Sequence, residues 1–448
     1  MDSDRLSVNR RVRLCASSSS TLHHLKPRFR LSVTLLLLFC GLSAAHGQDS
    51  AIARWDMQRL SQAPPMRWVS QSGPVHSLLY AGEQFDGHDT EVFAFYASPK
   101  TLGEANGEEH FPGVVLIHGG GGTAFAEWTW LWAKRGYAAI AMDLSGSRPI
   151  DPLYDADGVP VLNQSSKPDT RTRLPNGGPN HGHPEKFDSI GGEISDDWPY
   201  HAVASVIRAH SLLRSFPEVT ADRTAVTGIS WGGYTTCLVA SVDSRFRAAV
   251  PVYGCGFLFE GESVQKPAID RLGDRRDDWI AAYDPSRSLI ECRVPILFVN
   301  GTNDIHYPLD SYQKSFDAVP GKKQMRIEVN MAHGHPPGWR PVEIGLFIDS
   351  FCRDGVPLPV PGEPVREGTT VRVPVTSELP LASATLHYTT DAGLRSARKW
   401  QSQPAQITAD GIVADGLPAD ANTWLISVKD SRGAMVSTTV QFASAATE

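Results

Sequence analysis

This sequence has few cysteines, and beyond its N-terminal region it has no long apolar run. Six of its 448 residues are cysteines, and their spacings match no metal-binding motif. One disulfide is possible in an oxidising compartment, but the sequence does not say which cysteines would form it. Beyond residue 47 no stretch is apolar and long enough to cross a bilayer, so we expect no stable membrane insertion of the mature chain.

The first 47 residues have the features of a signal peptide. Residues 1–30 are polar and basic, an apolar run follows over Leu31–Leu42, and the small residues Ala45 and Gly47 precede the expected cleavage site. The apolar run is about 12 residues long, which is too short for a membrane anchor. We therefore expect a secreted or periplasmic protein.

The mature chain is short of basic residues. Residues 1–47 contain seven Lys and Arg and two Asp and Glu, which leaves 35 basic and 47 acidic residues and a net charge of −12. An acidic chain of this kind is repelled by phosphate backbones and by anionic lipids. We therefore expect no nucleic acid and no anionic membrane surface among its partners.

Strand and helix patterns alternate through most of the mature chain. A continuous apolar run such as Gly113–Ile117 is typical of a strand buried on both faces of a parallel sheet. Strands of this kind recur, and helices such as His201–Ser215 fit between them. The alternation predicts an α/β fold with a doubly wound, mostly parallel sheet. Two insertions, residues 145–200 and 257–290, interrupt it.

The pattern changes after the Pro-rich linker Asp354–Pro364. Short alternating strands separated by turn residues fill the last ~85 residues, which predicts a small all-β sandwich of the Ig-like type. We thus divide the chain into a signal peptide (1–47), an α/β domain (48–355), and a linker with a β-sandwich (356–448). We expect the sandwich to serve attachment or stability. The alternative is that it packs against the α/β domain and completes its fold.

A nucleophile motif lies between a buried strand and a helix start. The segment Gly228-Ile229-Ser230-Trp231-Gly232 has the pattern Gly-x-Ser-x-Gly. The flanking glycines permit a sharp turn in which a side chain would clash. The serine hydroxyl is then presented at a helix N-terminus, whose dipole favours developing negative charge. Ser230 is therefore the candidate nucleophile, against the alternative of a capping serine.

A serine nucleophile needs a base and a carboxylate that orients the base. Asp304 follows the strand Pro295–Asn300 and is the candidate acid, with Glu260 in reserve. The last strand of the sheet runs into Met331-Ala332-His333-Gly334-His335. Either histidine could reach the serine, and we favour His335 because a loop of several residues must carry the ring back over Ser230.

A glycine run follows the buried strand at Gly113–Ile117. Backbone N–H groups must approach a substrate oxygen closely to form an oxyanion hole, and glycine allows that approach. We expect one donor from Gly120 or Gly121 and the other from Trp231. The pair His181 and His183 has no third residue spaced to complete a metal site, so we expect neither a metal nor a cofactor.

These residues resemble the dienelactone hydrolase, prolyl oligopeptidase and acetyl xylan esterase branch of the α/β-hydrolase superfamily. The similar segments are Val115–Gly122, Asp222–Tyr234 and Asp284–Asp304. Dienelactone hydrolases use cysteine where this chain has Ser230. Prolyl oligopeptidases carry a propeller, for which there is no room between the cleavage site and the glycine run. The resemblance is strongest in architecture to secreted acetyl xylan esterases.

The resemblance and the motifs together imply a serine hydrolase that cleaves carboxylic esters through an acyl-enzyme, with a carbohydrate ester such as acetylated xylan as substrate. One alternative is a peptidase of the prolyl oligopeptidase type without a propeller. Another is a secreted binding protein with a vestigial hydrolase fold.

Overall fold

The computed structural model describes residues 52–161, 170–182, 184 and 186–443. Residues 49–448 form one compact unit. The expected signal peptide lies outside the described residues. None of the helices in the described ranges combines the length and the apolar composition that a bilayer span requires.

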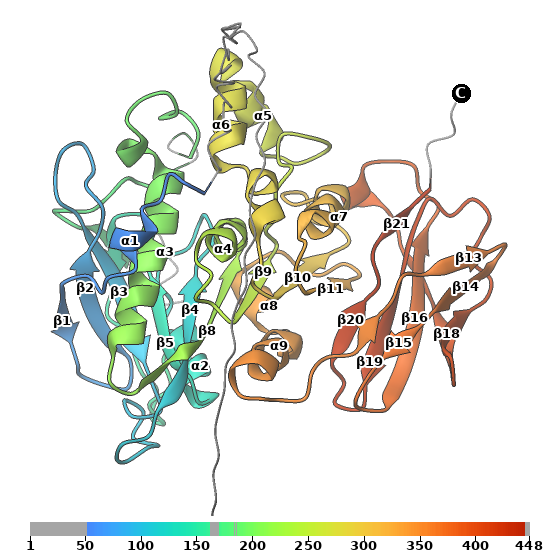
Figure 1. Ribbon diagram of the computed structural model, residues 1–448, viewed down its shortest axis with the longest axis horizontal. Coiled ribbons are helices and arrows are strands. Elements are labelled where there is room, and N and C mark those ends of the chain that lie inside the picture. Colours follow the sequence, from blue (N-terminus) through green and yellow to red (C-terminus); the bar gives the residue numbers. More distant parts are fainter. Residues whose placement is uncertain (1–51, 162–169, 183, 185, 444–448) are drawn as a thin grey trace, which may run out of the picture. The chain divides into compact units, whose positions relative to one another are not determined.

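A mixed sheet forms the centre of the α/β part (Figure 1). The strands at one edge pair antiparallel with their neighbours, and the strands that follow them across the sheet of the α/β part pair parallel with one another. The predicted α/β class with a mostly parallel sheet is therefore confirmed. In spatial order the strands are β1 (Met66–Ser70), β2 (His76–Ala81), β3 (Glu91–Ala97), β5 (Ala138–Met142), β4 (Phe111–Ile117), β8 (Val219–Ile229), β9 (Ala248–Val252), β10 (Ile296–Gly301) and β11 (Lys323–Glu328).

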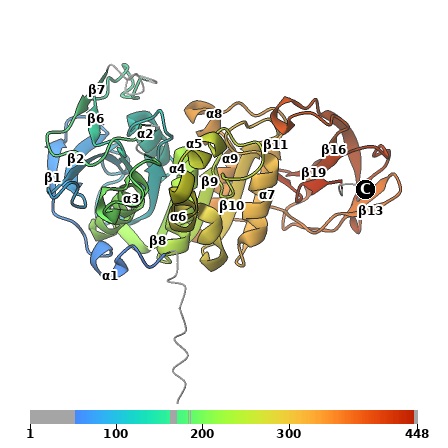
Figure 2. The same ribbon diagram turned by 90° about the horizontal axis from the view of Figure 1, so that it is seen from above.

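The central strands are largely buried because helices cover both faces of the sheet. Every residue of β5, β9 and β10 is buried. Helix α2 (Ala126–Lys134) lies beside α9 (Val342–Cys352), and their side chains meet in the ion pair between Arg135 and Asp349. Helices α3 (Trp198–Ser215) and α4 (Trp231–Val242) form a second packed pair (Figure 2).

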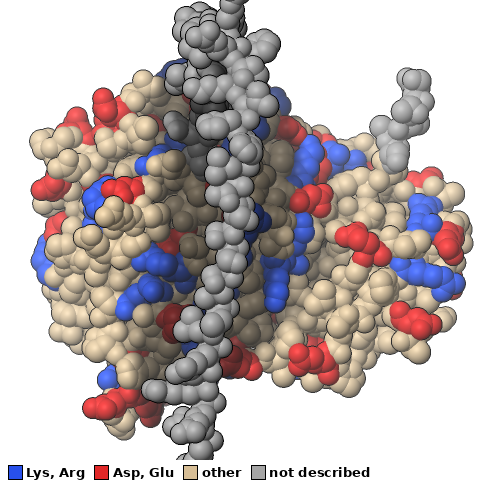
Figure 3. Space-filling view, viewed as in Figure 1, with Lys and Arg blue, Asp and Glu red and all other residues tan. Residues whose placement is uncertain are grey.

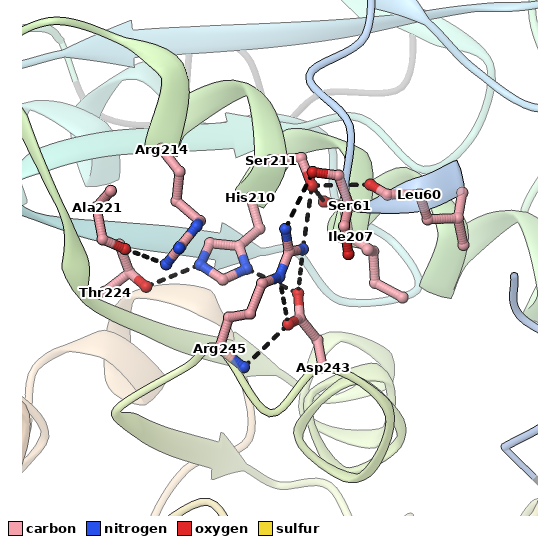
Figure 4. A network of polar contacts seen from close by, with 10 residues as sticks. All are labelled: Leu60, Ser61, Ile207, His210, Ser211, Arg214, Ala221, Thr224, Asp243 and Arg245. Atoms are coloured by element: carbon pink, nitrogen blue, oxygen red, sulfur yellow. Dashed lines mark hydrogen bonds and ion pairs between the residues drawn. The ribbon is translucent and has the colours of Figure 1, made fainter. Parts of the chain in front are cut away.

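A buried polar network ties α3 to the sheet (Figure 4). The ring of His210 lies 2.8 Å from Asp243 through Nδ1 and 2.7 Å from the Thr224 hydroxyl through Nε2. The Arg245 guanidinium donates to the same carboxylate over 2.6 Å. The arrangement copies the order hydroxyl, imidazole, carboxylate of a catalytic triad. Since His210, Thr224 and Asp243 are completely buried, a substrate cannot reach it, and its role is structural.

The two insertions differ in structure. The first contains the hairpin of β6 (Ser147–Pro149) and β7 (Arg171–Arg173). The second is helical, with α5 (Lys266–Asp270) and α6 (Arg276–Tyr283). The remaining helices are α1 (Met57–Leu60), α7 (Leu309–Ala318) and α8 (His335–Trp339).

The C-terminal part is all β, as predicted, while its Ig-like character stays a prediction. Its longest strands, β16 and β19, pair antiparallel, and β17 connects β16 on one side to β18 on the other. The strands are β12 (Val360–Pro361), β13 (Val365–Glu367), β14 (Thr370–Val373), β15 (Val375–Thr376), β16 (Leu381–Thr389), β17 (Gln401–Thr408), β18 (Gly411–Ala414), β19 (Thr423–Asp430), β20 (Met435–Ser437) and β21 (Gln441–Phe442).

The β part is joined to the α/β sheet by backbone pairing. Strand β20 pairs antiparallel with β11, with Met325 opposite Ser437. The main-chain N–H of Met435 also donates to the buried carboxylate of Glu343 on α9 over 2.6 Å. Four cysteines of the described part, Cys237, Cys255, Cys292 and Cys352, are buried and free.

Candidate active site

Ser230 occupies a sharp turn between β8 and α4. Its backbone has φ 59° and ψ −118°, a region that a non-glycine residue rarely adopts. The two flanking glycines are required because a side chain at either position would clash with the backbone. A Cβ on Gly228 would lie 2.2 Å from the carbonyl oxygen of Gly232, and a Cβ on Gly232 would lie 2.1 Å from that of Ile117. The predicted nucleophile turn is therefore present.

Ser230, His333 and Asp304 form one hydrogen-bonded chain. The Nε2 atom of His333 lies 3.0 Å from the Ser230 hydroxyl oxygen, and its Nδ1 lies 2.8 Å from Asp304 Oδ2. Asp304 is buried, and its second oxygen accepts the main-chain N–H groups of His306 and Tyr307. The carboxylate is thus fixed from behind, and it can orient the imidazole so that Nε2 faces the serine.

The expectation that His335 is the base is corrected by this geometry. His333 lies five positions beyond Glu328, the last residue of β11, and that short loop already brings its ring to the serine. His335 begins helix α8 and points elsewhere, since its Nε2 accepts the main-chain N–H of Gly119 over 2.9 Å. Burial lowers the pKa of His335 to about 3, so its ring stays neutral.

The glycine run lies beside the nucleophile. Gly120, Gly121 and Trp231 line the same cavity as Ser230. The approach is close, because a Cβ on Gly120 would lie 2.5 Å from the Trp231 ring. All three expected oxyanion residues are therefore brought next to the serine. The N–H of Gly119 is directed to His335 instead.

A cavity of about 580 Å³ opens over Ser230. Most of the side chains around it carry a polar group. The first insertion contributes Asn180, His181 and Lys186, and the opposite side is formed by Gln265 and His306. Apart from the glycines, the apolar lining is limited to Ile229 and Trp231 among the described residues.

Lys186 is a cavity residue that the sequence did not indicate. It is only 3% exposed, donates to the carbonyl oxygens of His181 and Gly182, and lies 5.2 Å above the Trp231 ring. An ammonium group above an aromatic face is favourable when it is withdrawn from water. No motif marks this lysine, because it stands in a Gly- and Pro-rich segment without periodicity.

The sequence also indicated a reserve acid, Glu260, and a histidine pair, His181 and His183. Glu260, the reserve acid, pairs with Lys314 at 2.5 Å and is partly exposed. His181 borders the cavity, and burial lowers the pKa of its ring to about 3. His183 is outside the described residues. Within the described ranges no group of three metal-binding side chains occurs.

Comparison with protein families matches part of this chain. Residues 175–342 match the prolyl oligopeptidase family, and this segment contains all three residues of the hydrogen-bonded chain. The uncharacterized peptidase YuxL of Bacillus subtilis (strain 168) is 24% identical over 263 residues, which are 52% of this chain. The chain aligns with only 33% of that relative's length. The resemblance to the α/β-hydrolase superfamily is thereby confirmed, and the chain is similar to serine hydrolases.

Solved structures that are similar to part of this chain include esterases and peptidases. An acetyl xylan esterase from Paenibacillus sp. R4 has 20% identity and a TM-score of 0.49, covering 68% of this chain and 95% of its own. Acetyl xylan esterase 1 from Thermoanaerobacterium sp. JW/SL YS485 has 16% identity and a TM-score of 0.46, covering 65% and 91%. The acylaminoacyl peptidase of Pyrococcus horikoshii has 17% identity and a TM-score of 0.43, covering 61% and 42%.

Proposed function

We propose that this serine hydrolase cleaves carboxylic esters of polar alcohols, with acetylated carbohydrates such as xylan as its substrate class. The observation that carries the proposal is the hydrogen-bonded chain of Ser230, His333 and Asp304 at a cavity whose lining includes many polar side chains. The hydroxyl groups of a carbohydrate need polar partners of this kind. Among the described lining residues, Ile229 and Trp231 are the apolar side chains against which a long aliphatic acyl chain could pack.

The chemistry follows from the positions of the three residues. The Ser230 oxygen attacks the ester carbonyl carbon while His333 Nε2 takes the hydroxyl proton. The carbonyl oxygen becomes negatively charged, and main-chain N–H groups of the glycine run and of Trp231 stabilise it. His333 then gives the proton to the leaving alcohol, and an acyl-enzyme remains. Water, deprotonated by His333, releases the acid and restores the serine.

Asp304 stabilises the positive charge that His333 acquires in each half of the reaction. Its carboxylate is 2.8 Å from Nδ1 and is held by two main-chain N–H groups. Because the carboxylate is fixed before the reaction, no reorganisation is needed when the imidazolium forms. No step of this sequence of events requires a cofactor.

A peptidase acting on short peptides is the second candidate, and the match of residues 175–342 to the prolyl oligopeptidase family favours it. The same serine, histidine and aspartate would cleave an amide. A non-catalytic binding protein is the third, and the hydrogen-bonded chain speaks against it, because a binding role needs no such alignment.

We further propose that the protein is secreted or periplasmic after removal of residues 1–47.

The net charge of −12 of the mature chain disfavours nucleic acid as a partner. On the face shown in Figure 3, acidic and basic side chains are interspersed outside the part covered in grey. A phosphate backbone would need a continuous basic surface.

Substrate profiling of the mature protein tests the proposal. Acetylated xylo-oligosaccharides, p-nitrophenyl esters with acyl chains of two to twelve carbons, and dipeptide amides would be compared by kcat/KM, with Ser230→Ala as the blank. We expect the acetylated sugars to be best and activity to fall as the acyl chain lengthens. Faster cleavage of the amides would establish the peptidase. A serine that a fluorophosphonate probe does not label would establish the binding protein.

A further inference from the structure

Arg395 of the C-terminal β part contacts a segment that leads to the active-site cavity. Arg395 begins a short turn between β16 and β17. Its main-chain N–H donates to Glu262 Oε2 over 2.7 Å, and its guanidinium Nη1 lies 3.3 Å from Glu262 Oε1 and 3.6 Å from Asp310 Oδ2. Both side chains of the Arg395 and Glu262 pair are 27% exposed. A pair partly withdrawn from water is less screened than a surface pair.

The residues after Glu262 lead directly to the cavity. The Val264 N–H donates to the carbonyl oxygen of Ile305 over 3.1 Å, and the Ser263 hydroxyl donates to the carbonyl oxygen of His306 over 2.7 Å. The Gln265 side chain then reaches the ring of His306, with Nε2 3.3 Å from Nδ1, and both residues line the cavity. The segment 262–265 is therefore pinned at one end by the β part and at the other by the loop that carries the acid.

His306 contacts both the histidine and the aspartate of the hydrogen-bonded chain. Its ring centroid lies 4.7 Å from that of His333, and its main-chain N–H donates to Asp304 Oδ1 over 2.7 Å. The His333 ring also packs against Tyr253, at 4.6 Å between centroids. The imidazole thus contacts two rings, and one of them, His306, is in contact with the segment 262–265.

We propose that Arg395 is a positioning residue through which the C-terminal β part fixes one wall of the substrate cavity. The inference rests on the proposed hydrolase function of Ser230. The β part then belongs to the catalytic unit: without the Arg395 contact, the segment 263–265 and the Gln265 and His306 side chains lose their outer support. Substrate groups that contact this wall are then bound more weakly, while the serine and its base keep their own hydrogen bonds. A displacement of this kind acts mainly on substrate binding.

Steady-state kinetics of full-length variants test the proposal. Arg395→Ala and Glu262→Ala should each raise KM for an acetylated oligosaccharide about tenfold and change kcat by less than about threefold. The double variant should resemble either single one, because both changes break the same contact. Arg395→Lys should recover most of the loss, because its ammonium can still pair with Glu262 and its main-chain N–H is unchanged.

Arg398→Ala is the matched control. Arg398 lies in the same loop, but its guanidinium contacts Asn422 and Thr423 within the β part. We expect its KM to stay near that of the native protein. Equal KM values for the Arg395 and Arg398 variants, or additive effects of the Arg395 and Glu262 changes, would overturn the proposal.

The outcome is separable from that of the proposed function. If the native protein cleaves amides rather than esters, the same ratios of variant to native KM are measured on the amide. If it cleaves neither, the concentration dependence of Ser230 labelling by a bulky fluorophosphonate replaces KM. An unchanged dependence in Arg395→Ala would then refute the positioning role, whatever the natural substrate is.

Discussion

The Nε2 atom of His335 accepts the main-chain N–H of Gly119 at 2.9 Å and fills the inside of the glycine run. The same atom stands where a side chain on Gly122 would be, 2.7 Å from its ideal Cβ position. Phe125 packs against the ring with 4.6 Å between centroids. Two histidines separated by one glycine therefore have different partners: His333 contacts the nucleophile, and His335 supports the loop expected to hold the oxyanion.

Removal of the acceptor on residue 335 should slow turnover without abolishing it. His335→Phe keeps an aromatic ring but leaves the Gly119 N–H without its partner, so the glycine run loses its fixed shape. Loss of one oxyanion donor costs roughly 10²–10³ in kcat, and a displaced loop should cost about 10–100-fold. His335→Gln offers an amide oxygen at a similar reach and should retain most of the activity. Equal losses in the two variants would show that the hydrogen bond is not what matters.

Ser230→Ala should fold normally and lose turnover by about 10⁵- to 10⁶-fold, because the serine forms the covalent bond to the acyl group. His333→Ala should be almost as severe, because without a base the hydroxyl is a weak nucleophile. The measurement is kcat on a p-nitrophenyl ester, with circular dichroism to check the fold. A His333→Ala protein more active than His335→Ala would contradict the assignment of the base.

The buried His210 should make stability depend on pH. Burial lowers its pKa from 6.5 to about 4, although the neighbouring Asp243 opposes that shift. Between these two values the unfolded chain binds a proton that the folded protein does not, so the free energy of unfolding falls as the pH falls. At pH 4 the loss from this residue is about 3 kcal/mol relative to pH 7.

Denaturant unfolding at pH 7, 6, 5 and 4 measures this contribution. His210→Gln removes the titrating group and should be less stable than the native protein at pH 7, because the contacts to Asp243 and Thr224 are weakened. Its stability should nevertheless decline less between pH 6.5 and 4. Parallel pH curves for the two proteins would exclude His210 as a source of the dependence.

The α/β class could be predicted from the sequence because strands buried on both faces of a parallel sheet consist of continuous apolar residues. Gly113–Ile117 was recognised in this way, and the structure has β4 at Phe111–Ile117. The stretch Met435–Phe442 is divided into the short strands β20 and β21, which the sequence pattern does not show. Strand β20 pairs with both β11 and β19, whereas β21 pairs with β19.

The site was predictable where a local motif reports it. Ser230 follows from the two glycines around it, and Asp304 from its place after a buried strand. The choice between His333 and His335 was not predictable, because it depends on the direction of a loop and on the start of α8. Lys186 and Gln265 could not be found either, since they reach the cavity from insertions that carry no periodic pattern.

The connection between β20 and β11 changes what is expected of a protein that ends at Arg353. From the sequence, such a protein should stay soluble and active on small esters. In the structure, removal of the β part would leave β11 as an unpaired edge strand. Met325 and Ile327 on this strand, which are 2% and 1% exposed in the full-length protein, would become more accessible to water. An unpaired edge with apolar neighbours promotes aggregation. We now expect the shortened protein to be largely insoluble.

Unfolding of the full-length protein provides the second test of this expectation. Glu343 on α9 accepts the Met435 N–H and pairs with Arg326 at 3.0 Å, and both charged side chains are buried. Glu343→Ala leaves the arginine without this partner and the Met435 N–H without an acceptor, which should cost about 3 kcal/mol. Because the contact between Glu343 and the Met435 N–H joins the α/β part to the β part, calorimetry should show one transition that moves to lower temperature as a whole. Two separate transitions, with only one of them displaced, would mean that the β part folds independently and that the shortened protein should be soluble after all.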